Sequence, residues 1–138
     1  MTRAITDFEG SWQISRSIDD RFGGQKATFA GQATLIPCQD GSWKWEESGY
    51  LTLGEDAPIK ATRIYYWRPA PPQIEVFFED GRPFHSFDPS GADTAAHWCD
   101  PDDYRAQYEF KDWPQWQAIW RVKGPLKDYE MISRYTRA

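Results

Sequence analysis

The chain has 138 residues, 21 acidic against 16 basic side chains, a formal net charge of −5 at pH 7, and eight tryptophans. This length suits one domain with a core of its own, so we expect a single domain over residues 1–138. The negative charge argues against a nucleic-acid partner, whose phosphates require a basic surface, and against binding to an anionic membrane. So many tryptophans indicate a cavity that aromatic rings line, and hence a small-molecule partner.

The sequence begins without the apolar segment of a secretory signal, and no run approaches the roughly 18 apolar residues of a membrane span. Cys38 and Cys99 are the only cysteines, and without an export signal we expect two reduced thiols rather than a disulfide. We therefore expect a cytoplasmic protein, as a monomer or a homodimer.

Alternation of apolar and polar residues with a period of two predicts β-strands along nearly the whole chain. The predicted strands are 9–18, 26–37, 42–54, 59–68, 73–79, 82–88, 94–99, 103–111, 115–123 and 126–136. No apolar stripe with helical spacing persists for three turns, which leaves room for a short helix only at 18–25 or 100–105. About ten antiparallel strands joined by short turns form either a closed up-and-down barrel or a two-sheet sandwich.

Charged residues share a face with aromatic residues in several of these strands. Three rows show the pattern: Trp12-Ile14-Arg16-Ile18, Trp43-Trp45-Glu47 and Ala61-Arg63-Tyr65-Trp67. A buried unpaired charge costs several kcal/mol, so inward rows stay apolar unless water or a ligand occupies the interior. A sandwich core of this size has no room for such rows. We therefore predict an all-β fold, an antiparallel up-and-down barrel of about eight to ten strands with a polar cavity.

The turn at Gly124-Pro125 tests which face is inward. It suits a two-residue type II′ hairpin, with the glycine at positive φ. That register pairs Trp120 with Tyr129 on the aromatic face and brings Lys127 to the same face near a rim.

The turn at Asp80-Gly81 leaves two registers open. A two-residue turn directs His85 inward and leaves Arg82 outside. A three-residue loop directs Arg82 inward and His85 outward. Either His85 or Arg82 therefore faces the cavity.

Gly10-Ser11-Trp12 opens the first predicted strand. A Gly-x-Trp at this position, closed by an arginine of the last strand that lies over the indole, is the signature of the lipocalin and wider calycin barrels, which the chain thus resembles. Arg134 or Arg137 would supply the arginine. The resemblance implies that Trp12 closes one end of the barrel.

Three further blocks, Phe78–His85, His97–Tyr104 and Gly124–Tyr129, join the Trp12–Arg16 start in a more specific pattern. Together they resemble an uncharacterised family of bacterial and fungal proteins, a domain of unknown function, over nearly the whole chain. The resemblance implies one lipocalin-like barrel and no established activity. A chromophore-handling role, as in lipocalin-like bilin lyases, would follow by analogy of fold alone. The candidate site residues that it suggests are Arg63, Arg82, His85, His97 and Lys127.

Metal binding is the first alternative use of the two histidines. His85, His97 and Cys99 carry donor atoms for zinc or copper, but the clustered spacing of a structural zinc site is missing. A haem held by one histidine would need a more apolar lining than Arg16 and Glu47 allow. We therefore expect no metal and no cofactor.

The polar, aromatic-lined cavity predicts binding of a small organic anion with an aromatic or apolar body. Arg16 and Arg63 face inward by parity, and a guanidinium inside a barrel binds carboxylate or phosphate, with an internal salt bridge to Glu47 as the alternative. Arg63 in particular should lie within salt-bridge reach of Glu47 or of a bound anion. The predicted ligand-binding residues are Arg16, Trp45, Glu47, Arg63, Tyr65, Arg82, Tyr108, Trp120 and Lys127.

The alternative function is a cofactor-independent acid–base enzyme, such as an isomerase, cyclase or lyase, that uses the same cavity. A histidine beside a carboxylate is the usual acid–base unit near neutral pH, and His97 with Asp100 or Asp102, or His85 with Glu47, would supply one. The candidate catalytic residues are His85, His97 and Tyr129, with the tyrosine holding a developing oxyanion. A third class, a protein-interaction module that uses surface tryptophans, leaves the inward charges unexplained.

Overall fold

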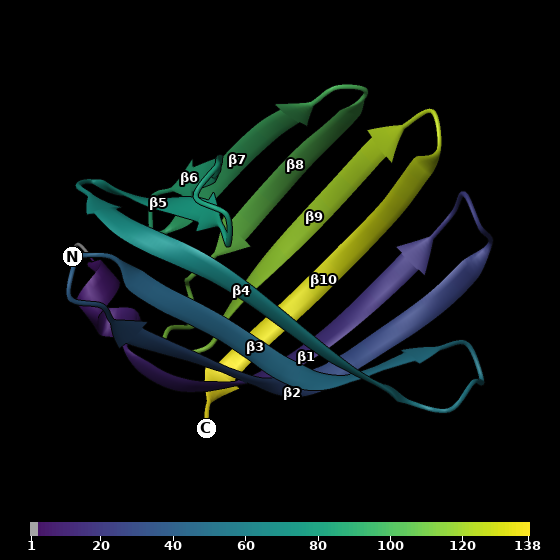
Figure 1. The fold of residues 1–138 in the computed structure, drawn as a ribbon, viewed down its shortest axis with the longest axis horizontal. Helices are drawn as coiled ribbons and strands as arrows, with labels where there is room; N and C mark the ends of the chain where they lie inside the picture. Colours follow the sequence, from purple (N-terminus) through teal and green to yellow (C-terminus); the bar gives the residue numbers. More distant parts are fainter. Residues whose placement is uncertain (1–2) are drawn as a thin grey trace.

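The computed structural model describes residues 3–138, and ten β-strands make up most of them (Figure 1). The strands are β1 (Gly10–Asp20), β2 (Gln25–Pro37), β3 (Trp43–Leu53), β4 (Ile59–Ala70), β5 (Gln73–Phe78), β6 (Pro83–Phe87), β7 (Ala92–Cys99), β8 (Asp102–Glu109), β9 (Trp116–Gly124) and β10 (Lys127–Arg137). Every predicted strand is present, with ends that differ by at most two residues.

The position predicted for a short helix, at 18–25 or 100–105, was wrong. Hairpin turns and strand ends occupy residues 18–25 and 100–105, while the helical turn of the described chain is the 3-10 helix η1 (Ile5–Phe8). Nothing in residues 3–138 forms a helix with the length and apolar content that a bilayer crossing requires.

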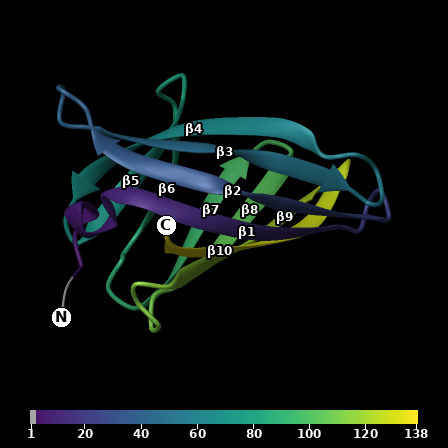
Figure 2. The ribbon, with the colours of Figure 1, turned by 90° about the horizontal axis from the view of Figure 1, so that it is seen from below.

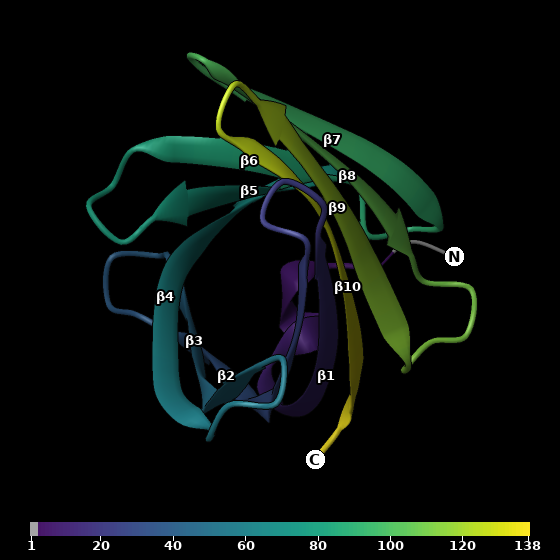
Figure 3. The same ribbon diagram turned by 90° about the vertical axis from the view of Figure 1, so that its right-hand side faces the viewer.

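The ten strands form one antiparallel sheet in the order β6-β5-β4-β3-β2-β1-β10-β9-β8-β7. The sheet curls into a ring, which Figure 3 shows from one end. Its two edge strands, β6 and β7, contact each other but form no hydrogen-bonded ladder. The protein is therefore a nearly closed up-and-down barrel, as the charged residues on the inward rows predicted.

The two faces of each strand follow the predicted alternation. In β1, Trp12, Ile14 and Arg16 are buried and the residues between them are exposed. The β9–β10 register differs from the prediction, because Gly124 pairs with Lys127 and Trp120 therefore pairs with Met131. This shift is an even number of residues, so it leaves the aromatic face of both strands unchanged.

One end of the barrel is closed by η1 and by the start of β1 (Figure 2). Trp12 is fully buried there, and its indole Nε1–H donates a hydrogen bond to the Phe8 carbonyl at 2.9 Å. The guanidinium carbon of Arg137 lies 3.9 Å from the centre of the indole, and its Nη1 donates to the Glu9 carbonyl at 2.7 Å. The predicted closure is confirmed, with Arg137 rather than Arg134 as the arginine.

A pair of glycines makes room for one ring inside the barrel. Gly31 and Gly49 face each other in the β2–β3 ladder, and a Cβ on either would collide with the backbone of the opposite strand. The ring of Phe29 lies over both glycines, with the guanidinium of Arg16 at 5.2 Å from its centre. The glycines thus position the aromatic surface that covers Arg16.

Candidate ligand-binding site

The interior of the barrel holds two neighbouring cavities that share a wall of charged residues. The inner cavity is about 60 Å³ and includes Trp116, which contacts Trp12 at the closed end; the outer cavity is about 120 Å³. Each offers room for several water molecules. The residues that line both are Arg16, Glu47, Arg63 and Met131. The aromatic residues of the inner wall include Trp45, Tyr65, Trp67, Tyr108, Trp116 and Trp120.

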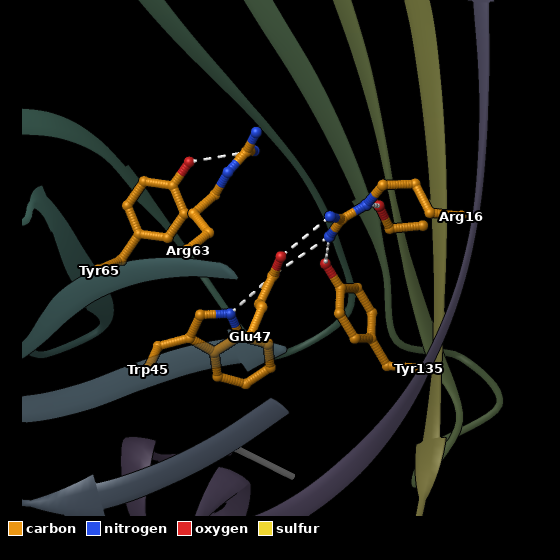
Figure 4. Close-up of polar contacts among 7 residues, drawn as sticks. Arg16, Trp45, Glu47, Arg63, Tyr65 and Tyr135 are labelled. Atoms are coloured by element: carbon orange, nitrogen blue, oxygen red, sulfur yellow. Dashed lines mark hydrogen bonds and ion pairs between the residues drawn. The ribbon is translucent and has the colours of Figure 1, made fainter. Parts of the chain in front are cut away.

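Arg16 and Glu47 form a buried bidentate ion pair (Figure 4). The Nη1 and Nη2 atoms of Arg16 donate to the two carboxylate oxygens of Glu47 at 2.9 and 3.1 Å. The Nε of Arg16 donates to the Ser133 hydroxyl at 2.6 Å, and Nη2 also reaches the Tyr135 hydroxyl at 3.3 Å. All three guanidinium nitrogens therefore have partners, and Arg16 is held by the protein itself.

The Glu47 carboxylate is also fully engaged. Besides Arg16 it accepts a hydrogen bond from the Trp45 indole at 3.0 Å, and only 3% of the residue is exposed. Burial raises the pKa of Glu47, but the charge and hydrogen bonds of Arg16 outweigh this and hold the pKa below its ordinary value. The internal salt bridge that the sequence left as one of two possibilities is thus formed, with Arg16.

Arg63 lies on the same wall but is held differently. It is the direct cross-strand neighbour of Glu47, yet no carboxylate of residues 3–138 lies within ion-pair distance of its guanidinium. Its hydrogen bond is from Nη1 to the Tyr65 hydroxyl, at a long 3.4 Å. Figure 4 shows its guanidinium beside Tyr65 and apart from the Arg16–Glu47 pair. Arg63 is exposed to solvent while it lines both cavities.

The charges that line the cavities do not cancel. The ionised side chains of the two linings are Arg16, Glu47 and Arg63, two positive and one negative. The residues that line the cavities therefore sum to a charge of +1 in a protein whose total is −5. That excess resides on Arg63, because Arg16 and Glu47 neutralise each other.

The β5–β6 hairpin resolves the choice between His85 and Arg82. A three-residue loop forms, since Phe78 N–H donates to the Arg82 carbonyl at 2.8 Å, but a bulge then shifts the register. Because Phe84 is the extra residue, His85 returns to the inner face opposite Val76, and both Phe84 and His85 line the inner cavity. Arg82, which was predicted to bind the ligand, lines neither cavity: its side chain is 73% exposed and forms an ion pair with Asp80 at 2.7 Å.

His85 is a half-buried imidazole that lines the inner cavity. Its Nε2 lies 2.8 Å from the Tyr108 hydroxyl, and neither histidine has an ion pair with a carboxylate of the described chain. Burial, and then the nearby His97, lower the pKa of His85 to about 3. The predicted histidine–carboxylate units are therefore absent from residues 3–138, because the nearest groups to His85 are aromatic.

Three other predicted site residues line neither cavity. Lys127 lies at the rim, where its ammonium contacts the Tyr104 hydroxyl and Asp102, both at 3.1 Å. His97 is half-buried and packs edge-on against Phe84, with ring centres 5.4 Å apart. Tyr129 belongs to the inner face of β10 but lies beyond Met131 toward the hairpin.

Several residues at the site were not among those predicted, including the hydroxyl partners of Arg16, Ser133 and Tyr135. Met131 lines both cavities, and Trp116 forms part of the inner wall. Parity placed both on the inner face, but a methionine and one tryptophan among eight carry no chemical signal of their own. In the described chain, no three His, Cys, Asp or Glu side chains gather as a metal site would require, and Cys38 and Cys99 are unpaired.

Fold and site together define a class of protein: a nearly closed antiparallel barrel with a charged layer, formed by Arg16, Glu47 and Arg63, between its two cavities. Several solved structures share the fold. The S-type phycobiliprotein lyase CPES from Guillardia theta aligns with a TM-score of 0.66 at 10% identity, over 96% of this chain and 89% of that one. A protein of unknown function from the DUF3598 family of Nostoc punctiforme aligns with a TM-score of 0.64 at 11% identity, over 99% of this chain and half of that one. EF1p2_mFAP2b, bound to DFHBI, aligns with a TM-score of 0.50 at 16% identity, over 100% and 99% of the two chains.

The chain belongs to the family of unknown function DUF6314, whose pattern matches residues 8–137. No protein with a curated function matches the sequence. The predicted membership of an uncharacterised family and the predicted barrel fold are thereby confirmed.

Proposed function

We propose that the barrel binds a small organic anion with an aromatic or apolar body, through Arg63. The observation that carries this proposal is the uncompensated charge of Arg63 at the boundary of the two cavities, beside an arginine–glutamate pair that is saturated. A carboxylate or similar group of the ligand would accept hydrogen bonds from the Arg63 guanidinium, as the Glu47 carboxylate does from Arg16. Aromatic walls on the inner side and apolar side chains on the outer side would contact the body of the ligand.

The size of the cavities limits the ligand to about a single ring. Their volumes, about 60 and 120 Å³, lie well below the several hundred Å³ of a typical drug-sized pocket. Met131 lines both, and its unbranched, flexible side chain is the part of the dividing wall that moves at the lowest cost. A ligand that spans both cavities would displace Met131 and leave the rigid ion pair in place.

The fold of the neighbours supports a small-molecule role without specifying the molecule. One neighbour is a phycobiliprotein lyase and another holds DFHBI, so barrels of this shape handle small molecules in at least those two cases. The acid–base enzyme is less well supported. A histidine with a pKa of about 3 is a poor base near neutral pH, and His85 has no carboxylate beside it.

Benzoate and benzamide test the proposal, because they have nearly the same shape and differ in charge. Calorimetric titration should show benzoate binding to the native protein and benzamide binding at least tenfold more weakly. Arg63→Met should remove that preference. Arg68→Met is the matched control, an arginine of the same strand paired with Asp40 outside the cavities, and should leave benzoate affinity unchanged. Equal affinity for both probes, or an Arg63→Met variant that still prefers benzoate, would contradict the proposal.

A further inference from the structure

Two residues that line the inner cavity each carry a polar atom without a hydrogen-bond partner among residues 3–138: Nε1 of Trp116 and Nδ1 of His85. Both atoms are buried. The indoles of Trp12 and Trp45 are equally buried, and each has a partner. An unpaired buried donor or acceptor costs about 1–3 kcal/mol, so two of them in one wall require an explanation.

The chemistry of the two atoms restricts what could pair with them. An indole N–H only donates. In a neutral imidazole one ring nitrogen donates and the other accepts, so the role of Nδ1 depends on the tautomer. Nε2 of His85 lies next to the Tyr108 hydroxyl, which can accept from it or donate to it, so both tautomers are compatible with this contact. A hydroxyl group accepts from Trp116 and complements His85 in both tautomers. A carbonyl oxygen would serve only one of them.

We propose that the inner cavity is a subsite for a neutral hydroxyl group carried on an aromatic ring, hydrogen-bonded to Trp116 and His85. The ring would pack against Tyr108 and Trp120, which line the same cavity. This inference rests on the proposed function and sharpens it: the ligand is a hydroxylated aromatic acid. Its charged group lies at Arg63 and its hydroxyl at the inner end.

Phenol tests the hydroxyl subsite by itself, because it has no carboxylate that could bind Arg63. Calorimetric titration should show phenol binding about tenfold more tightly than fluorobenzene, which has a similar shape and no hydroxyl. Trp116→Phe keeps the aromatic packing but removes the N–H, and should remove most of that preference. Trp113→Phe is the matched control, because Trp113 packs against Phe8 and Trp12 outside both cavities. His85→Phe, which removes the second partner, should weaken phenol binding as well and replaces Trp116→Phe if that variant does not fold.

Comparison of charged probes separates failure of the subsite from failure of the proposed function. If both hold, 4-hydroxybenzoate binds more tightly than 4-methylbenzoate and more tightly than phenol. If phenol and fluorobenzene bind equally, or if Trp116→Phe and His85→Phe both leave phenol affinity unchanged, the subsite is refuted even where benzoate binds. If phenol binds through Trp116 but benzoate shows no preference over benzamide, the subsite stands and the anion site at Arg63 fails.

Discussion

The closed end and the charged layer of the barrel both depend on arginines, and the arginines are held in different ways. At the closed end, Arg137 lies on the outside of Trp12 and donates to backbone carbonyls, where water also reaches it. In the charged layer, Arg16 is buried and saturated by a carboxylate and two hydroxyls. Arg63 belongs to the same layer but lacks a carboxylate. The two arginines of one wall thus differ: the protein satisfies every guanidinium nitrogen of Arg16, whereas Arg63 has one long hydrogen bond among the described residues.

The largest effect should come from breaking the buried pair. Glu47→Ala leaves Arg16 as a buried charge without its carboxylate, which should lower the free energy of unfolding by about 3–5 kcal/mol. Denaturation by urea measures the loss. Glu46→Ala is the control, since its contact with Lys44 is a surface pair at 3.6 Å and should contribute at most about 1 kcal/mol. Similar losses in the two variants would show that the charged layer contributes no more than the surface.

A pH dependence follows from the burial of His85 in the inner wall. Its pKa falls from 6.5 in the unfolded chain to about 3 in the folded protein. Below pH 6.5 the unfolded chain therefore binds a proton that the folded protein does not, so stability falls as pH falls, by up to about 1.4 kcal/mol per pH unit toward pH 3. Unfolding measured from pH 7 to pH 5 should lose about 2 kcal/mol from this group.

His85→Gln is the variant that tests this pH dependence. It should flatten the slope between pH 7 and pH 5, because glutamine does not titrate. His97→Gln, at the half-buried histidine that lines neither cavity, should retain the slope. A slope that survives in His85→Gln would assign it to other groups.

At the closed end we expect a smaller effect. Arg137→Met removes the cation from above Trp12 and two hydrogen bonds to backbone carbonyls, all at an exposed position. Stability should fall by about 1–2 kcal/mol. The reference is Arg134→Met, which lies on the outer side of the same strand and should change stability by less than about 0.5 kcal/mol. Thermal unfolding of the two variants measures the difference. Equal stability of Arg137→Met and Arg134→Met would show that Arg137 contributes nothing to the closed end beyond an ordinary surface arginine.

The smallest effect on stability should come from Arg63→Met. This side chain is exposed and its one hydrogen bond is long, so stability should change by less than about 0.5 kcal/mol or rise slightly. The same variant should abolish the preference for benzoate, which separates binding from folding. Unfolding of the Arg63→Met protein would instead make Arg63 structural, like Arg16.

The strands, the inward faces of most of them and the closed end followed from the sequence. Apolar alternation is a local property of the chain, and each inward row needed only its own residues to be recognised. The resemblance of the Gly-x-Trp start to calycin barrels predicted closure by Trp12 and an arginine of the last strand, either Arg134 or Arg137. The structure has Arg137 there, at 3.9 Å from the indole centre. The polar rows predicted a charged interior, because charges of both signs shared the aromatic face.

The tertiary structure alone decided which arginine Glu47 binds and which way the β5–β6 residues face. The alternation of residues along a strand predicts which face a side chain is on, but not which residue it pairs with. Arg63 is the cross-strand neighbour of Glu47, whereas Arg16 reaches Glu47 from β1, across β2. The carboxylate pairs with the arginine that the curved sheet buries most, because an unpaired charge costs more there than at the solvent-exposed Arg63. A single-residue bulge at Phe84 likewise reversed the faces of β6, and the alternation pattern contains no mark of such an insertion.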